Sequence, residues 1–165
     1  RDVLVKNIRG NVDTRIQKLK DGLYDAIVLA AAGVKTLRLE KNIKQIFTPK
    51  EVLPAVGQGI IAVQCRKEDT NIINLLEKID HKQTRQCAEA ERTLLKIIGG
   101  DCDTAVGGLA TIKNDELTLY AQLFSDDGIN IFNYKIAGGK EEGFKLGILA
   151  GIELLKQAGT NFKKN

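Results

Sequence analysis

The sequence IGGDCDTAVGG, residues 98–108, places a cysteine in a glycine-rich loop between a long amphipathic segment and a strand-like run. Glycine adopts backbone conformations that other residues avoid, so such a loop can hold a thiol clear of the packed elements on either side. The sequence therefore predicts a junction between a helix and a sheet, with Cys102 presented there rather than buried.

The neighbours of Cys102 disfavour its thiolate form. Asp101 and Asp103 flank it with negative charge, and the preceding helix directs its partially negative C-terminal end toward it. The only histidine, His81, precedes that helix, and at ~1.5 Å per residue it is expected about 25 Å from the helix's far end. A Cys-His hydrolase pair is excluded, which leaves a cysteine that is idle, oxidised or permanently occupied.

The residues after the loop predict a small antiparallel sheet. Strands are expected at 106–112, 117–125 and 129–137, joined by the turn sequences Asn114-Asp115 and Asp126-Asp127-Gly128. Amphipathic helices are expected on one face of this sheet. The first covers 83–98, with one apolar side made of Cys87, Ala90, Leu94, Leu95 and Ile98. The second covers 141–158, with an apolar face made of Phe144, Ile148, Leu149, Ile152 and Leu155.

The residues before the loop predict an α/β pattern. Apolar, β-prone runs indicate strands, and they occur at 3–8, 24–33, 43–47 and 60–65. Helices are expected at 14–20 and 34–39, and Asp69 or Thr70 is expected to cap a third. Cys65, inside the last of these strands, is expected to be a small buried hydrophobe. The predicted fold class is thus α/β followed by α+β.

A candidate anion site lies at residues 9–15, which read RGNVDTR. Asn11 or Asp13 can cap the helix that follows, and the backbone N–H groups and dipole of a helix N-terminus attract anions. Arg9 and Arg15 bracket the turn, and either guanidinium can bind a carboxylate through two hydrogen bonds. Ordinary surface charges are the alternative interpretation.

Two further segments allow close approach to the backbone. The run Leu29-Ala30-Ala31-Ala32-Gly33 ends in small residues. The segment LPAVGQG, residues 53–59, has a glycine on each side of Gln58, which suits a hinge or a close backbone approach, although a plain connector has the same composition.

Composition limits the class of protein. Of 165 residues, 43% are hydrophobic and 28% charged, as in soluble globular proteins, and no apolar run is long enough to span a membrane. A net charge of +4 with 5% aromatic residues gives little support for nucleic-acid binding. Two interpretations of the positive charge remain, a solvated basic surface and a basic cleft for a small polyanion. Three widely spaced cysteines fit neither a disulfide framework nor a zinc site, so a cytoplasmic location and no metal are expected. Because the chain opens with Arg1 and not with Met, directly before a predicted strand, we expect it to be part of a longer polypeptide.

Five segments in register resemble the hydroxymethylbilane synthase family, also called porphobilinogen deaminases. They are residues 9–15, 29–33, 53–59, Ala90-Glu91-Arg92 and the Gly-Asp-Cys loop. The resemblance implies a monomeric three-domain enzyme, in which two α/β domains like those of periplasmic binding proteins flank a cleft. The third domain, of α+β class, carries a dipyrromethane cofactor bound covalently to a loop cysteine, at the position of Cys102.

The resemblance also implies a domain assignment. Residues 1–54 correspond to the later part of domain two, 55–80 to a returning segment of domain one, and 81–165 to the cofactor-carrying domain. Most of domain one, the missing N-terminal part of the same polypeptide, has no counterpart here.

The implied reaction is the joining of four porphobilinogen units, with loss of ammonia, onto the anchored dipyrromethane, followed by release of hydroxymethylbilane for haem biosynthesis. Cys102 forms its thioether with an intrinsically electrophilic partner, so a low thiol pKa is unnecessary. Every pyrrole brings an acetate and a propionate, and the resemblance makes Arg9, Arg15, Gly33 and Gln58 the other cofactor-binding residues.

Three departures from the family pattern stand out. The family's acid/base carboxylate belongs to the absent domain, so this chain alone is expected to be inactive. Thr36 stands where relatives commonly have a cleft arginine, and nearby Arg38 is a candidate replacement. Asp13 stands where a glycine is usual, and it either weakens the anion site or caps the helix. The alternative function is a non-enzymatic small-carboxylate binding module with an idle loop cysteine.

Overall fold

The computed structural model describes residues 3–100 and 104–159. Its contacts divide the chain into two compact units, Arg1–Phe47 and Thr48–Asn165, and each unit is described by itself. The domain boundaries expected after residues 54 and 80 stay predictions. Within the described residues, every helix is too short or too polar to cross a membrane.

The first unit is built from short helices. These are α1 (Val12–Lys20), α2 (Ala31–Thr36) and the 3-10 helix η1 (Glu40–Asn42). The predicted helix at 14–20 is confirmed, starting two residues earlier, whereas α2 begins three residues before the predicted 34–39. Ile16 of α1 and Val34 of α2 are the buried apolar side chains of the described part of this unit. The core of this unit is therefore small.

The strands predicted before the cysteine loop are not formed. The segments 3–8, 24–30, 43–47 and 60–65 have no strand pairing, and residues 31–33 belong to α2. Their apolar side chains lie in solvent: Val5 is 90% exposed, Val28 76% and Ile61 92%. A strand is stabilised by hydrogen bonds to a neighbour, and a parallel sheet takes its neighbours from distant parts of a chain. Since no described segment pairs with them, these apolar runs remain extended coil.

The second unit contains the predicted antiparallel sheet. Its strands are β1 (Val106–Lys113), β2 (Glu116–Phe124) and β3 (Ile131–Gly139), in the order β1-β2-β3. Each observed boundary lies within two residues of the prediction. Asn114 and Asp115 both have positive φ, 51° and 61°, as a two-residue type I′ hairpin turn requires.

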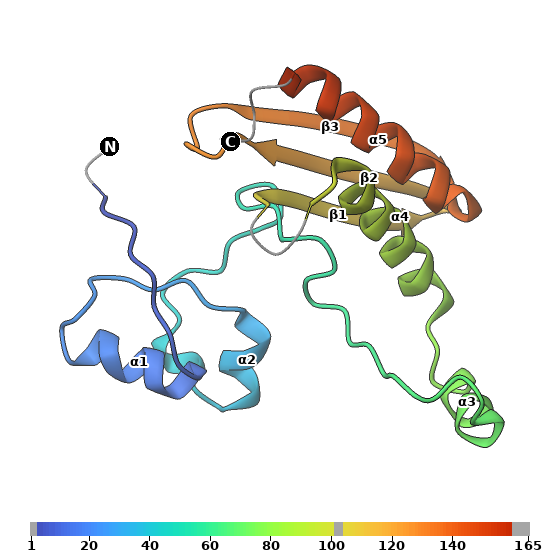
Figure 1. Cartoon of the computed structure of the whole chain (residues 1–165). Coiled ribbons are helices and arrows are strands. Elements are labelled where there is room, and N and C mark those ends of the chain that lie inside the picture. The colour runs from blue at the N-terminus through green and yellow to red at the C-terminus, as the bar shows by residue number, and fades with distance from the viewer. Residues whose placement is uncertain (1–2, 101–103, 160–165) are drawn as a thin grey trace. The chain divides into compact units, whose positions relative to one another are not determined.

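Helices α4 (Lys82–Ile98) and α5 (Gly143–Ala158) lie on the same face of this sheet (Figure 1), as expected. The 3-10 helix η2 (Lys140–Glu142) leads into α5. Between the helices and the sheet lies the hydrophobic core, whose largest fully buried side chains are Leu94, Leu117, Leu119, Leu123 and Leu154. Cys87 packs against this core, as predicted.

The predicted core face of α5 is wrong at three of its five positions, whereas Leu155 packs against the core as expected. Phe144, Leu149 and Ile152 are 56%, 42% and 53% exposed, and the buried face instead carries small residues with two leucines: Gly143, Leu146, Gly147, Ala150, Gly151 and Leu154. The reason is close helix packing, because a Cβ added to Gly147 would lie 2.5 Å from the Ala90 carbonyl oxygen of α4.

Helix α3 (Thr70–Glu77) begins where the sequence indicates. Asp69 is its N-cap, and the carboxylate accepts a hydrogen bond from the Ile72 N–H at 3.2 Å. None of its side chains is buried, and Leu75 is 56% exposed. Cys65, expected in a strand core, is half-buried in extended coil, because the strand itself does not form.

Candidate functional site

The structure places the two ends of the cysteine loop, while Cys102 itself lies outside the described residues. α4 ends at Gly99, which has φ +69°, and the Gly100 N–H donates to the Leu95 carbonyl at 3.0 Å. After the loop, the Phe124 N–H of β2 donates to the Ala105 carbonyl at 3.0 Å. The loop is therefore held between a capped helix end and a paired strand.

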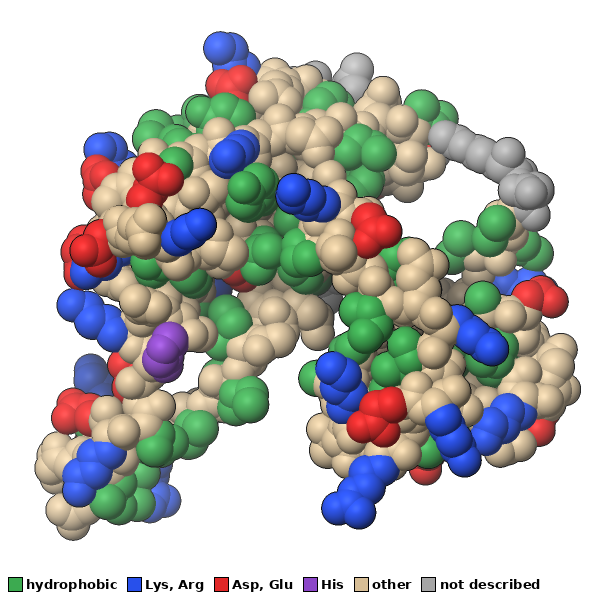
Figure 2. Space-filling model, turned by 180° about the vertical axis from the view of Figure 1, so that it is seen from behind, with side chains coloured by type: hydrophobic (Ala, Val, Ile, Leu, Met, Phe, Trp, Pro, Cys, Tyr) green, Lys and Arg blue, Asp and Glu red, His purple; other side chains and the backbone are tan. Residues whose placement is uncertain are grey.

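The single histidine lies at the end of α4 opposite to the loop. His81 is the N-cap of α4, and its Nδ1 accepts a hydrogen bond from the Thr84 N–H at 3.3 Å. Its ring is at the surface, where it is the purple side chain of Figure 2. The seventeen residues of α4 separate it from the loop. Because α4 separates His81 from the start of the loop, its length argues against a Cys-His pair, as the sequence indicated.

The segment before Gln58 lies along the free edge of β1. The Gly108 N–H donates to the Pro54 carbonyl at 2.9 Å, and Ala55 forms an antiparallel bridge with Gly107. A Cβ added to Gly108 would lie 2.9 Å from Val56 Cγ2, so this strand position needs a glycine. The segment covers the edge strand that follows the cysteine loop.

Gln58 occupies an exposed turn at the end of this segment. Its N–H donates to the Ala55 carbonyl at 3.0 Å, and the flanking Gly57 and Gly59 have φ of +72° and +82°. An added Cβ would meet no atom within 4 Å at either glycine, so the backbone conformation, not crowding, favours glycine here. The segment that leads into the Gln58 turn and the strand that follows the Cys102 loop thus meet at β1, while the other end of the loop leaves α4.

Sequence reasoning missed a role for Glu91, which it placed only in the family-like Ala90-Glu91-Arg92 segment. Glu91 is 3% exposed, and its Oε1 accepts from the Ala110 N–H at 2.9 Å while its Oε2 accepts from the Gly57 N–H at 2.8 Å. Burial raises the pKa of this carboxyl, and the two hydrogen bonds oppose that shift. The available signal was an acidic residue on the core-facing side of an amphipathic helix.

Cys87 is the titratable neighbour of this carboxylate on α4. Burial raises the pKa of its thiol, and the negative charge of Glu91 adds to the rise. Cys87 is therefore an inert core thiol rather than a reactive one.

In the first unit, the predicted anion turn is held by its own cations. Gly10 has φ +122°, and the Arg15 Nε–H donates to the Gly10 carbonyl at 2.6 Å. The Lys18 ammonium donates to the Arg9 carbonyl at 2.9 Å, and the Arg9 side chain is exposed. The side chains of Arg15 and of Lys18, in the last turn of α1, thus both bind backbone carbonyls of this turn.

Asp13 lies inside the first turn of α1 and is not its N-cap. Its carboxylate accepts from the Thr14 N–H at 2.8 Å, whereas Asn11, at the N-cap position, makes no side-chain capping bond. Neither of the two predicted capping side chains therefore makes an N-cap hydrogen bond, and the Asp13 carboxylate binds an N–H group within the first turn. It also keeps a negative charge beside the helix end.

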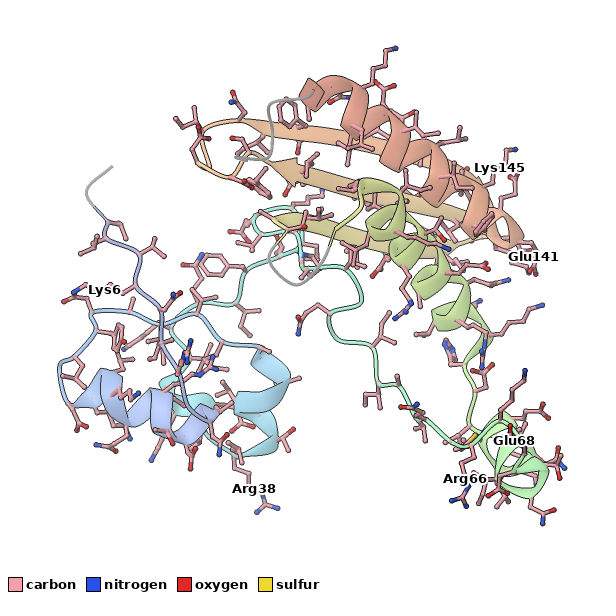
Figure 3. All side chains as sticks on the ribbon, viewed as in Figure 1. Lys6, Arg38, Arg66, Glu68, Glu141 and Lys145 are labelled. Atoms are coloured by element: carbon pink, nitrogen blue, oxygen red, sulfur yellow. The ribbon has the colours of Figure 1, made fainter. Side chains whose placement is uncertain are left out.

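Gly33 lies close to the same turn. It belongs to α2, and an added Cβ would lie 3.4 Å from Val12 Cγ2 at the start of α1, which is ordinary van der Waals contact. The Thr36 hydroxyl donates back to the Ala32 carbonyl at 3.0 Å. Arg38, with φ +55°, is exposed and points outward from the end of α2 (Figure 3), so the replacement of a cleft arginine by Arg38 stays a prediction.

Comparison with known families identifies both parts of the chain. Residues 1–74 match a family model described as "Porphobilinogen deaminase, dipyromethane cofactor binding domain". Residues 85–156 match "Porphobilinogen deaminase, C-terminal domain". The chain belongs to the porphobilinogen deaminase family.

Curated porphobilinogen deaminases agree with this assignment. The protein of that name from Coxiella burnetii (strain Dugway 5J108-111) is 47% identical over 155 residues, which cover 94% of this chain and 50% of that relative. The one from Roseiflexus castenholzii (strain DSM 13941 / HLO8) is 43% identical over 158 residues, covering 96% of this chain and 52% of that relative. The chain spans about half the length of the curated relatives it matches.

The candidate residues divide between the two porphobilinogen deaminase models. Arg9, Arg15, Gly33 and Gln58 fall within the range that matches the cofactor-binding model. Cys102 falls within the range that matches the C-terminal model. The resemblance that the sequence motifs suggested is therefore confirmed at the level of the family.

Proposed function

We propose that this chain is part of a hydroxymethylbilane synthase, a transferase that joins four porphobilinogen units and releases hydroxymethylbilane for haem and other tetrapyrrole synthesis. The observation that carries the proposal is the Gly100-Asp101-Cys102 sequence between α4 and β1, in a chain of the porphobilinogen deaminase family. Each addition forms one carbon–carbon bond, breaks one carbon–nitrogen bond and releases ammonia.

The residues of this chain fit a dipyrromethane bound through Cys102. Such a group carries acetate and propionate side chains, and residues 1–47 hold ten lysines and arginines against five aspartates and glutamates. When bound, the dipyrromethane supplies the pyrrole ring to which new units are added. Cys102 gives up its thiol proton once, forms the thioether and then acts as a tether.

The two arginines have separate tasks at the carboxylates. The Nε–H of Arg15 donates to the Gly10 carbonyl, and this hydrogen bond fixes the orientation of the guanidinium. The terminal N–H groups of Arg15 are not used in that bond and can donate to a carboxylate. The exposed guanidinium of Arg9 can form a paired hydrogen bond to a carboxylate. Gly33, within α2, allows close approach to the backbone, and Gln58 offers a side-chain amide at the surface of its turn.

The finer organisation is also part of the proposal. We infer that residues 1–54 belong to an α/β domain like those of periplasmic binding proteins, 55–80 to the domain that precedes it, and 81–165 to the cofactor-carrying domain. The acid/base carboxylate belongs to the part of the enzyme outside this chain. The whole enzyme is a cytoplasmic monomer that works on porphobilinogen and its oligomers, without nucleic acid or membrane partners.

Turnover tests the proposed function. The chain is joined to the half of the Coxiella burnetii relative that it does not match, and porphobilinogen consumption and ammonia release are measured. We expect activity that is lost in Cys102→Ser and kept in the control Cys65→Ser, with a raised KM in Arg9→Ala and Arg15→Ala. Carboxylate binding that requires Arg9, without turnover and indifferent to Cys102, would instead support the binding-module alternative.

A further inference from the structure

We propose that Glu91 is a positioning residue that holds the Gln58 turn and the two stems of the Cys102 loop together as one body. The role of this body in the reaction rests on the proposed function. Glu91 lies on α4, the helix that leads into the loop, and Ala110 lies on β1, the strand that leads out of it. The third partner, Gly57, opens the Gln58 turn.

The geometry joins three segments that are distant in sequence. Gly57 lies 34 positions before Glu91, and Ala110 lies 19 positions after it. Each carboxylate oxygen accepts one backbone N–H, at 2.8 Å from Gly57 and 2.9 Å from Ala110. One side chain therefore ties the helix before the loop, the strand after it and the neighbouring turn to one another.

The chemistry of the site requires a carboxylate. Within the described residues Glu91 has no ion pair, so the two N–H groups are the partners that compensate its burial. A glutamine has one oxygen and one NH2 group, so it can accept from only one of the two N–H donors. An acidic residue in the core of an otherwise apolar helix face is explained by this double acceptance.

The effect on Gln58 is local. The Pro54 carbonyl and the Ala55 bridge hold the start of the segment on β1 without Glu91. Beyond them, Val56 packs against the hydrophobic core, and the hydrogen bond from Gly57 is the described hydrogen bond that joins the turn to α4. Because Gly57 and Gly59 both adopt positive φ, the turn has few steric limits of its own, and loss of Glu91 frees Gln58 while leaving the sheet intact.

Amide hydrogen exchange of this chain tests the proposal. In Glu91→Gln, we expect the Gly57 or Ala110 amide that faces the new NH2 group to exchange about 10- to 100-fold faster, the effect of losing one hydrogen bond to an ionised group. The core amide of Leu94 serves as the global reference. The matched control Glu89→Gln, on the exposed side of α4, leaves all three amides unchanged. Equal exchange at Gly57 and Ala110 in the Glu91 variant and the wild type would overturn the proposal.

A second measurement needs no variant. In an NMR titration of the wild-type chain, the Gly57 and Ala110 amide proton shifts are expected to follow one common carboxyl pKa, that of Glu91. Cys87, its titratable neighbour, has a raised thiol pKa and does not titrate in that range. Different midpoints for the two amides, or no movement, would contradict the shared carboxylate.

A third experiment measures activity, and it uses the chain joined to the half of the Coxiella burnetii relative that the chain does not match. Glu91→Gln is expected to lower the rate of porphobilinogen consumption about tenfold, in line with the lost hydrogen bond, while the mass of the Cys102 adduct stays unchanged. An adduct absent from the wild type as well would refute the proposed function but leave the exchange result valid. An adduct present, with full activity in Glu91→Gln, would refute the positioning role.

Discussion

Residues 3–47 and residues 82–159 contain similar apolar strand patterns, but only the second region forms strands. In the first, Val3, Val5 and Val28 are more than three-quarters exposed, at 81%, 90% and 76%. In the second, Leu117, Leu119 and Leu123 are fully buried. The difference lies in where the hydrogen-bonding partner of each strand is found, not in the apolar pattern.

The partners of β1, β2 and β3 follow within a few residues along the chain. Asn114-Asp115 joins the first hairpin, and a short turn joins the second, so pairing requires only a small loop closure. A parallel sheet needs crossover connections to more distant strands. The comparison shows that an apolar run specifies a strand only where its neighbour is available.

The largest expected effect is in amide protection. We expect the amides of β2 to be protected about 10³-fold or more relative to those of residues 24–30, because core amides exchange only through global opening. Hydrogen exchange followed by mass spectrometry or NMR measures this directly. Adding the half of the relative that this chain lacks should raise protection at 24–30 and leave β2 unchanged. Strong protection of 24–30 in this chain alone would break the comparison.

Helix packing gives the next effect. Gly147→Ala is expected to lower the free energy of unfolding of the second unit by about 2 kcal/mol, because the new methyl group would meet the Ala90 carbonyl and overpacking costs ~1–3 kcal/mol. Urea denaturation followed by circular dichroism measures it.

Gly33→Ala in α2 is the matched control, because its methyl group would only reach ordinary contact with Val12. Alanine is the better helix former, so the change in stability is expected within ~1 kcal/mol and on the stabilising side. Equal destabilisation by the two alanines would show that close helix packing does not distinguish the units.

The pH dependence of stability isolates Glu91. Burial raises its pKa above the usual 4.5, so the folded chain binds this proton more tightly than the unfolded chain. Its contribution to stability is complete below pH 4.5 and is lost as the pH rises through the folded pKa. Wild type should therefore lose stability relative to Glu91→Gln over this window.

The surface carboxyls behave in the opposite way. The pKa values of Asp80 and Glu142 are lowered by hydrogen bonds, first from Arg85 and Lys145 respectively, so their contributions are lost as the pH falls. They are the same in wild type and variant and cancel in the difference. If wild type instead gained stability relative to Glu91→Gln as the pH rises, the result would contradict the buried state of Glu91.

The smallest expected effect concerns the anion turn. Asp13→Asn keeps an oxygen for the Thr14 N–H and removes a negative charge from the first turn of α1, so KM for porphobilinogen in the completed enzyme should fall about two- to fivefold. Asp21→Asn, at the other end of α1, is the control and should leave KM unchanged. An unchanged KM in Asp13→Asn would show that this turn does not bind the carboxylates of the substrate.

Sequence reasoning succeeded where structure is local. The hairpin turns and the end of α4 after residue 98 depend on neighbouring residues and were predicted, and Asp69 was one of the two caps predicted for α3. The strands of the first region failed because their partners are not local.

Two misses in the second region have a different cause. The core face of α5 was misjudged because large apolar side chains were preferred over Gly143, Gly147 and Gly151, whose close contact with α4 no single-helix pattern reveals. Glu91 was missed as a site residue because its partners are backbone N–H groups of distant segments, which carry no side-chain signature.

The attachment at Cys102 is tested most directly by the intact mass of the denatured protein. For this measurement the chain is joined to the half of the Coxiella burnetii relative that it does not match, and the fusion is isolated from cells. The fusion should be heavier than its sequence mass by two linked pyrroles, and the added mass should lie on the peptide that contains Cys102. Cys102→Ser should have its sequence mass. A wild-type protein at its sequence mass, or an adduct that persists in Cys102→Ser, would contradict the account.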